Sequence, residues 1–391
     1  MQIIDGIPVW GDPVEVSALE QIKRCRATAD RVALMADHHK GYAVPIGGVV
    51  AYEHAISPSG VGFDIACGNK AVCTDANAAD VRARIKPIMD DVWRIISFGI
   101  GRHNQERVDH ELFDDEAWKL KPIGGLKQMA RDQLGTVGSG NHFVDIFADE
   151  RDRVWIGVHF GSRGFGHKTA TYFLEQAGAK DGMDVDPCVI KTNTSLAADY
   201  LECMRLAGRY AYAGRDWVCA RVLKILGAQS VEEIHNHHNF AWREKHGQDE
   251  FWVVRKGATP AFPGQRGFVG GSMGEISVII EGVENPLGRQ SLYSTIHGAG
   301  RVMGRMEARG KRDRKTGAVM REGKVTPKMM HEWVDRAGVE LRGAGADESP
   351  HCYKRLPEVL AHHEGTIKVL HTLTPIGVAM AGENEFDPYK D

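Results

Sequence analysis

Apolar and polar residues alternate along this chain in two distinct patterns, and each pattern predicts a different kind of element. Residues 14–36 place apolar side chains at helical spacing among charged ones, which predicts an early amphipathic helix. Residues 41–73 instead contain β-branched runs interrupted by glycine, which predict buried strands joined by tight turns. Helical spacing returns at 78–97, and a second glycine-rich pair of strands follows Gly135.

The second half of the chain continues this mixture of helices and strands. Residues 192–227 are expected to form the longest helix, with a break at Gly208 or Gly214. The other expected elements are a strand-rich block over 250–297, a charged segment over 301–325, a helix over 327–342 and a final strand over 367–380. Helices and strands that follow one another without a regular order are typical of the α+β class.

The residues that could carry chemistry are spread over most of the chain. Histidines beside glycine or asparagine occur from residue 38 to residue 297, so a single site would have to be assembled from distant segments. No internal repeat or low-complexity linker divides the sequence. We therefore expect one large mixed α+β domain over residues 1–382, with β-sheets around a central cleft and flanking helices, followed by a polar tail over 383–391.

The composition excludes several classes of protein. The chain has 49 lysines and arginines against 52 acidic residues, a net charge of −3, which excludes a histone-like or acidic-tail protein. It contains no apolar run of about eighteen residues and no signal-like N-terminus, so neither a membrane span nor secretion is expected. The seven cysteines have no paired spacing, which indicates a reducing compartment, the cytoplasm.

A set of potential metal ligands stands out among the 18 histidines. Asp64 and Cys67 lie three residues apart between glycines. His142 and His159 each lie in or beside a short apolar run, and His238 belongs to the sequence HNHHNF. A carboxylate, a thiolate and imidazoles suit manganese, zinc or iron better than magnesium, which prefers oxygen ligands. The alternative is a buried cysteine at a strand end with ordinary core histidines.

His297 lies in the sequence STIHGAGR. Its glycines and Arg301 suit a phosphate held by backbone N–H groups and a guanidinium, with the imidazole as a nearby nucleophile. The phosphate-loop pattern GxxxxGK[ST] is missing, so nucleotide binding would not use that cradle. Residues 301–325 contain nine basic residues against three acidic ones. This segment is either a solvated surface or a track for a phosphodiester backbone.

Six motifs of the chain together resemble those of one family. They are GVGFDIACG, GSGNHF, HFGSRGFGH, HHNF, GSMG and HGAGRVMGR. The same motifs occur in this order in the RtcB family of GTP- and manganese-dependent RNA-splicing ligases, and the resemblance covers about residues 37–377. It implies the α+β fold of that family and an enzyme that joins RNA ending in a 3′-phosphate or 2′,3′-cyclic phosphate to RNA with a 5′-hydroxyl.

The resemblance also implies roles for individual residues and partners. Two manganese ions would be held by Asp64, Cys67, His142, His159 and His238, with Cys67 bridging them. His297 would attack the α-phosphate of GTP, and Arg163 would lie near the phosphates. The positions that match the guanine-nucleotide pocket are Asn141, Phe143, Asp145, Ser272, Ser277, Ala299, Gly300 and Tyr353. RNA and GTP would be the partners of a monomer used in RNA repair or tRNA splicing, and an activating protein is left open.

The chain departs from the family pattern mainly around the nucleotide. The family closes with a lysine that touches the guanine nucleotide, whereas Met380 or Ala381 stands at that place here. Lys390 would replace it only if the tail folds back. The other departures are Asp145 for a glutamate, Ala66 for a glycine and Tyr42 for a lysine. The metal ligands are unchanged.

Two other functions are compatible with the same residues. A metal-dependent phosphohydrolase would open a 2′,3′-cyclic phosphate without transferring GMP, which the altered nucleotide pocket allows. An RNA-binding protein with a structural metal would use the basic segment 301–325 without catalysis.

Overall fold

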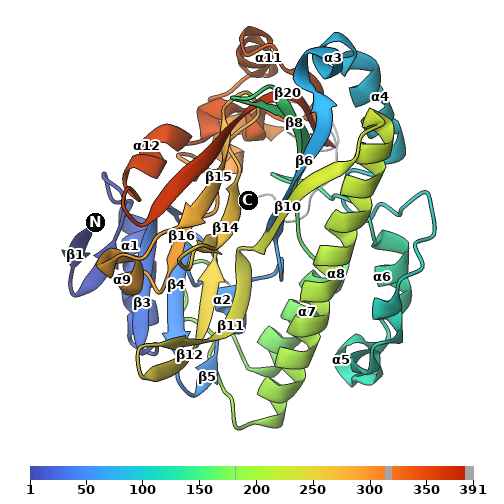
Figure 1. Cartoon of the computed structure of the whole chain (residues 1–391). Helices are drawn as coiled ribbons and strands as arrows, with labels where there is room; N and C mark the ends of the chain where they lie inside the picture. The colour runs from blue at the N-terminus through green and yellow to red at the C-terminus, as the bar shows by residue number, and fades with distance from the viewer. Residues whose placement is uncertain (181, 313–318, 384–391) are drawn as a thin grey trace.

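Two large β-sheets form the framework of the molecule, with the helices at its periphery (Figure 1). The computed structural model describes residues 1–180, 182–312 and 319–383. The first sheet has six strands in the order β1-β2-β3-β4-β12-β11. These strands are β1 (Gln2–Ile4), β2 (Ile7–Val9), β3 (Arg31–His39), β4 (Ile46–Tyr52), β12 (Asp249–Lys256) and β11 (Asn239–His246).

The second sheet has eight strands. Seven of them follow the order β10-β6-β8-β7-β20-β15-β14, and β19 pairs in parallel with β20. They are β10 (Ser230–His237), β6 (Gly68–Asn77), β8 (Arg153–Phe160), β7 (Phe143–Asp149), β20 (Ile367–Gly382), β15 (Ser277–Gly282), β14 (Arg266–Val269) and β19 (Glu340–Ala344). Because β10 and β11 follow each other directly along the chain, one strand of each sheet is joined to the other through a single residue, His238.

The remaining elements are short strand pairs and the helices. The pairs are β5 (Ala55–Ile56) with β9 (Ile190–Lys191), β13 (Ala258–Pro260) with β16 (Ser294–Ile296), and β17 (Gly310–Arg312) with β18 (Val319–Glu322). The α-helices are α1 (Val16–Arg26), α2 (Pro58–Val61), α3 (Ala78–Ala83), α4 (Ile85–Ile95), α5 (Lys121–Gly124), α6 (Lys127–Gln133), α7 (Arg163–Gln176), α8 (Ser195–Leu226), α9 (Pro286–Gln290), α10 (Arg305–Arg309), α11 (Pro327–Arg336) and α12 (Leu356–Ala361). Four 3₁₀ turns cover Glu111–Asp114, Glu116–Lys119, Ala346–Glu348 and Pro350–Cys352.

The core lies between the sheets and the helices that cover them. Helices α4 and α8 bury apolar residues such as Val92 and Val218 against Ile146 and Ile156 of the second sheet. Helices α1 and α7 pack into a second cluster with the first sheet. Removal of this apolar surface from water is the main driving force for the fold. The expected mixed α+β domain is therefore confirmed.

The predicted helix over 14–36 is only half right. Helix α1 ends at Arg26, and residues 31–39 form strand β3, which pairs with β2 and β4. The run Val32–Ala36 is apolar at every position and buried on both faces of the sheet, which is typical of an interior strand. Helical spacing was a false signal here, because a continuous apolar run satisfies both periods.

Helix α8 fits the prediction for 192–227 except for the expected break. It runs unbroken from Ser195 to Leu226 and ends at Gly227 in a left-handed conformation. A Cβ at Gly208 would lie 3.0 Å from the ring of Phe240, and one at Gly214 would lie 3.1 Å from the ring of Phe160. The two glycines therefore bring the helix close to both sheets rather than interrupting it.

The C-terminal elements need two corrections. The helix predicted over 327–342 ends at Arg336, because Gly338 adopts a positive φ of 67° and residues 340–344 turn back as β19. The final strand is longer than predicted and ends at Gly382. The tail 384–391, with Lys390, and residues Asp313, Arg314 and Lys315 of the basic segment lie outside the described residues.

The structure bears on two further expectations. None of the helices in the described residues combines the length and apolar character needed to cross a membrane. All seven cysteines are unpaired, in agreement with their irregular spacing.

Candidate active site

Three neighbouring strands bring the central side chains together. Cys67 directly precedes β6, His142 directly precedes β7, and His159 lies near the end of β8, which runs between them in the opposite direction. His159 is in register with Phe143 on one side and Asn69 on the other. Antiparallel neighbours place the start of one strand beside the end of the next. Three distant motifs therefore meet at one end of these strands.

The donor atoms at these strand ends lie within contact distance of one another. The Cys67 Sγ is 3.1 Å from His159 Nε2 and 3.6 Å from His142 Nε2. The His142 Nε2 is also 3.0 Å from Asp64 Oδ2, while its Nδ1 is 3.0 Å from the carbonyl of Val137. Cys67, His142 and His159 are all buried, and their ligand atoms form a group compact enough to hold a metal ion.

His238 joins this group from the junction of the two sheets. Its backbone N–H donates to the carbonyl of Cys67 at 2.8 Å. Its ring centroid lies 5.0 Å from that of His159 and 4.7 Å from that of His297. The buried Nδ1 of His238 has no hydrogen-bond partner among the described residues, which is the condition expected of a nitrogen that serves as a ligand.

Burial sets the ionisation of these groups. It lowers the pKa of His159 and His238 well below the ordinary value, so both rings stay neutral and keep a lone pair. Burial also raises the pKa of Asp64, but the hydrogen bond and charge of His142 outweigh it and bring that pKa to about 2. Burial raises the pKa of the Cys67 thiol, so a thiolate there calls for a cation, which deprotonates a coordinating thiol. The set fits a divalent transition metal.

The candidate ligands open into a cavity of about 910 Å³. All predicted site residues line it except Arg163 and Ser277; those that do are Asp64, Cys67, Asn141, His142, Phe143, Asp145, His159, His238, Ser272, His297, Ala299, Gly300 and Tyr353. Arg163 lies behind the wall, with its Nη1 3.3 Å from His142 Nδ1. The Ser277 hydroxyl accepts a hydrogen bond from the Gly271 N–H at 2.9 Å and so shapes the loop beside Ser272.

A carboxylate that the sequence analysis missed holds His297. The His297 Nδ1 lies 2.6 Å from Asp37 Oδ2, and the backbone N–H of His297 donates to the same oxygen at 3.0 Å. Asp37 is fully buried; burial raises its pKa, but the charge and hydrogen bonds of His297 lower it overall. A proton held on Nδ1 leaves the lone pair of Nε2 for nucleophilic attack. The signal was the sequence DHH at the end of an apolar run, hidden by the helix assigned to 14–36.

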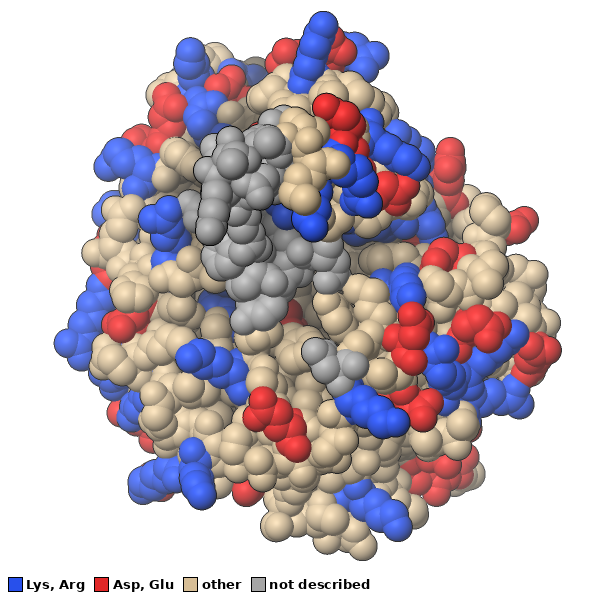
Figure 2. Space-filling view, turned by 180° about the vertical axis from the view of Figure 1, so that it is seen from behind, with Lys and Arg blue, Asp and Glu red and all other residues tan. Residues whose placement is uncertain are grey.

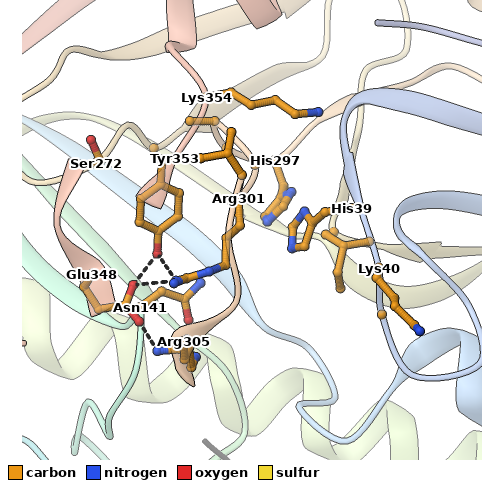
Figure 3. Close-up of a pocket in the computed structure, with 18 of the residues that line it drawn as sticks. His39, Lys40, Asn141, Ser272, His297, Arg301, Arg305, Glu348, Tyr353 and Lys354 are labelled. Carbon is orange, nitrogen blue, oxygen red and sulfur yellow. Dashed lines mark hydrogen bonds and ion pairs between the residues drawn. The ribbon is translucent and has the colours of Figure 1, made fainter. Parts of the chain in front are cut away.

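One part of the cavity contains a network of paired charges (Figure 3). Arg301 donates from Nη1 to the Tyr353 hydroxyl at 2.9 Å and from Nη2 to the carbonyl of Asp347 at 2.6 Å. Glu348 is in contact with Arg301, Arg305 and Tyr353. Neither Asp347 nor Glu348 was predicted from the sequence. The first arginines of the segment 301–325 are thus paired inside the cavity rather than exposed along a surface track.

The surface shows a similar balance of charge. On the face drawn in Figure 2, basic and acidic side chains are interspersed rather than gathered by sign. In the described part of 301–325, Lys324 pairs with Glu307 at 2.5 Å.

Lysines contribute most of the remaining positive charge in the cavity. Lys40, Lys256 and Lys354 line it, and none was singled out from the sequence. Lys256 is buried, which lowers its pKa to about 8, and it donates to the carbonyls of Tyr42 at 2.6 Å and Ser59 at 3.1 Å. A lysine followed by glycine at the end of an apolar strand was the available signal.

Two of the departures from the family motifs, Met380 and Asp145, lie in the part of the cavity where β7 and β20 pair. Met380, not Ala381, lines it, and on β20 it pairs with Phe143 of β7. Asp145 is buried, and its Oδ1 has no hydrogen-bond partner among the described residues. Burial raises the pKa of Asp145 well above its ordinary value, so the carboxyl is held toward its neutral form.

Comparison with known proteins places this arrangement in a family. A family model described as tRNA-splicing ligase RtcB matches residues 18–122 and 123–381. The chain belongs to the RtcB family. The predicted resemblance is therefore confirmed across nearly the whole chain.

Relatives within the RtcB family are similar over most of their length. RNA-splicing ligase RtcB1 of Escherichia coli is 30% identical over 415 residues, which cover 95% of this chain and 96% of the relative. The tRNA-splicing ligase RtcB of Pyrobaculum aerophilum is 31% identical over 434 residues, 88% of this chain and 86% of the relative. That of Archaeoglobus fulgidus is 31% identical over 431 residues, with the same shares of each chain.

The packing around Asp64 allows a test in which no candidate ligand is substituted. A Cβ at Gly161 would lie 2.1 Å from Asp64 Oδ1, so Gly161→Ala must turn the carboxylate away from His142. We expect this variant to fold but to bind Mn²⁺ roughly 10-fold or more weakly, measured by calorimetric titration. Gly125→Ala, where an added Cβ meets nothing within 4 Å, should bind like the wild type. Equal affinity for all three proteins would contradict a ligand role for Asp64.

Proposed function

We propose that this protein is an RNA ligase that joins a 3′-phosphate or 2′,3′-cyclic phosphate end to a 5′-hydroxyl end. The relatives reported above carry the names RNA-splicing ligase and tRNA-splicing ligase, which supports this class of reaction. The observation that carries the proposal is the position of His297. Its imidazole is held by Asp37 and lies beside the tilted ring of His238, in one cavity with the candidate metal ligands.

We infer that Asp64, Cys67, His142, His159 and His238 would hold two manganese ions. The mixed oxygen, sulfur and nitrogen donor set and the unpartnered His238 Nδ1 support this assignment. Bound divalent cations would neutralise the triphosphate and polarise its α-phosphorus.

In the proposed first step, His297 Nε2 attacks the α-phosphorus of GTP. A P–N bond forms, the bond to the bridging oxygen breaks, and pyrophosphate leaves. Asp37 keeps the proton on Nδ1 and stabilises the positive charge that develops on the ring. The GMP then passes to the RNA 3′-phosphate, and the 5′-hydroxyl attacks that phosphorus while GMP departs. A cyclic phosphate end would first be opened by water.

The nucleotide would occupy the part of the cavity between His297 and the paired strands β7 and β20. The predicted nucleotide contacts that line this cavity are Asn141, Phe143, Asp145, Ser272, Ala299, Gly300 and Tyr353. Arg301, Arg305 and the cavity lysines supply positive charge for phosphates, and Arg163 acts behind His142. We propose that the protein acts as a monomer. The unpaired cysteines support a reducing compartment, the cytoplasm.

Guanylylation is the direct test of the proposed nucleophile. Incubation with GTP labelled at the α-phosphate and Mn²⁺ should transfer labelled GMP to the wild-type protein. His297→Ala should reduce the label to background, because no other group replaces the attacking nitrogen. His331→Ala, which removes an exposed histidine of α11, should keep the full label. Label that persists in His297→Ala would place the nucleophile elsewhere.

The products formed from RNA separate the ligase from the two other functions considered. We expect joined RNA only when GTP, Mn²⁺ and a 5′-hydroxyl strand are all present, measured on gels with end-labelled strands. Opening of the cyclic phosphate without GTP and without joining would instead identify a phosphohydrolase. RNA binding with no change to either end would identify a non-catalytic protein. The reported relatives, all named as ligases, do not favour these alternatives.

Asp145 predicts a pH dependence of nucleotide binding. Guanine presents two N–H donors on its Watson–Crick edge, and an ionised carboxylate accepts them best. Because burial raises the pKa of Asp145 in the free protein, guanine must displace a proton below that pKa. GTP affinity should therefore rise with pH and level off above the raised pKa, as measured by calorimetry over a pH series.

The matched variants for this prediction are Asp145→Asn and Asp335→Asn. The first should bind GTP more weakly and without the rise in affinity below the raised pKa, because an amide does not ionise. The second changes an exposed carboxylate of α11 and should keep the wild-type profile. An unchanged profile in Asp145→Asn would show that this carboxyl does not meet the base.

A further inference from the structure

Arg215 is a fully buried arginine in the middle of α8 that the proposed reaction does not use. Its Nη1 donates to the carbonyls of Ala66 at 3.1 Å and Phe160 at 2.5 Å. Its Nη2 lies 3.0 Å from His237 Nδ1, and its Nε donates to His235 Nε2 at 2.8 Å. Because a guanidinium has only donors, both imidazole nitrogens act as acceptors here.

Three of these four acceptors are the immediate chain neighbours of candidate metal ligands. Ala66 precedes Cys67, Phe160 follows His159, and His237 precedes His238. Consecutive residues of a strand point to opposite faces, so the His159 ring faces the cavity while the next residue faces α8. One planar group therefore fixes three ligand-bearing segments from behind the site.

The local structure shows why these segments need an external hold. Ala66 has a positive φ of 61°, a conformation that a residue with a Cβ adopts only under constraint. His238 lies between two strands that belong to different sheets, outside both ladders. Tyr212, one turn before Arg215 on α8, stacks on the His237 ring at a centroid distance of 4.0 Å and so steadies the same contact.

The guanidinium has no ion pair with a carboxylate among the described residues. Burial lowers the pKa of Arg215 to about 10, so the group is still charged at neutral pH. A buried charge satisfied by two carbonyls and two imidazoles stabilises a fold poorly compared with an apolar residue of the same size. Its place is better explained by the geometry that its fork of donors imposes.

We propose that Arg215 is a positioning residue that sets the spacing of Cys67, His159 and His238 for metal binding. This inference rests on the metal site of the proposed function and extends it to a residue that touches neither metal nor substrate. It follows that a change at Arg215 alters the affinity and geometry of the metal site while every ligand is retained.

The test uses the full chain loaded with Co²⁺ as a spectroscopic probe and with Mn²⁺ by calorimetry. Wild-type protein should show a sulfur-to-cobalt charge-transfer band that is lost in Cys67→Ser. Arg215→Lys keeps the charge but not the fork, so we expect roughly 10- to 100-fold weaker metal binding and a shifted or weakened band. Thermal unfolding measured on the same samples reports the loss of stability separately.

Arg255→Lys is the matched control. Arg255 is also fully buried, but it holds Glu244, Ser294 and the carbonyl of Leu292 away from the candidate ligands. It should lower the unfolding temperature and keep the wild-type affinity and band. If Arg215→Lys does not fold, His237→Phe removes one anchor with Arg215 in place and should weaken metal binding in the same way.

The outcomes test the positioning role of Arg215 separately from the metal site itself. Wild-type affinity and an unchanged band in a folded Arg215→Lys protein would overturn the positioning role. Equal losses of affinity in Arg215→Lys and Arg255→Lys would also overturn it, because the effect would then reflect general destabilisation. A wild-type protein that binds neither metal, or whose band survives in Cys67→Ser, would instead overturn the metal site of the proposed function.

Discussion

Backbone hydrogen bonds between the Cys67 loop and the turn at His238 hold the two sheets and the candidate site together. The carbonyl of Cys67 accepts from the N–H groups of His238 and Asn239 at 2.8 and 3.2 Å, and the Ala66 N–H donates to the carbonyl of Asn239 at 2.7 Å. A slip of one residue in this pairing would turn a ligand away from the cavity. The register of the fold and the chemistry of the site therefore depend on the same contacts.

Burial then gives each ionisable group a different state within a small space. It keeps the rings of His159 and His238 neutral, whereas paired charges keep Asp37 and Asp64 ionised despite it. At the Cys67 thiol, burial and Asp64 outweigh the charges of Arg215 and Arg163, so its pKa is raised and a thiolate there calls for a cation. This distribution suits divalent cations at one end of the site and an imidazole nucleophile at the other, and Asp37 contacts His297 and Gly298 rather than a candidate metal ligand.

The part of the site that could be predicted from the sequence is the part carried by local motifs. Cys67, His142 and His159 lie near glycines at strand ends, so the residues around them in sequence indicate a site. Asp37 and Arg215 act through partners far away in sequence, and only the strand order and the course of α8 bring them to those partners. The same limit explains the error over 14–36, because the pairing of β3 with β4 outweighs its local pattern.

The two departures at the proposed nucleotide position, Asp145 and Met380, are physically linked. Asp145 pairs with Val378 and Phe143 pairs with Met380, so Asp145 and Met380 are diagonal neighbours on adjacent strands of the cavity wall. A lysine at the position of Met380 would lower the pKa of a nearby carboxyl, whereas a thioether gives it no counter-charge. Burial is then the dominant influence on Asp145, and its pKa rises. The shorter side chain of Asp145 also withdraws the carboxyl by one methylene. Met380 and Asp145 therefore leave a single buried carboxyl on this wall of the cavity, with a thioether rather than a basic side chain at the diagonal position.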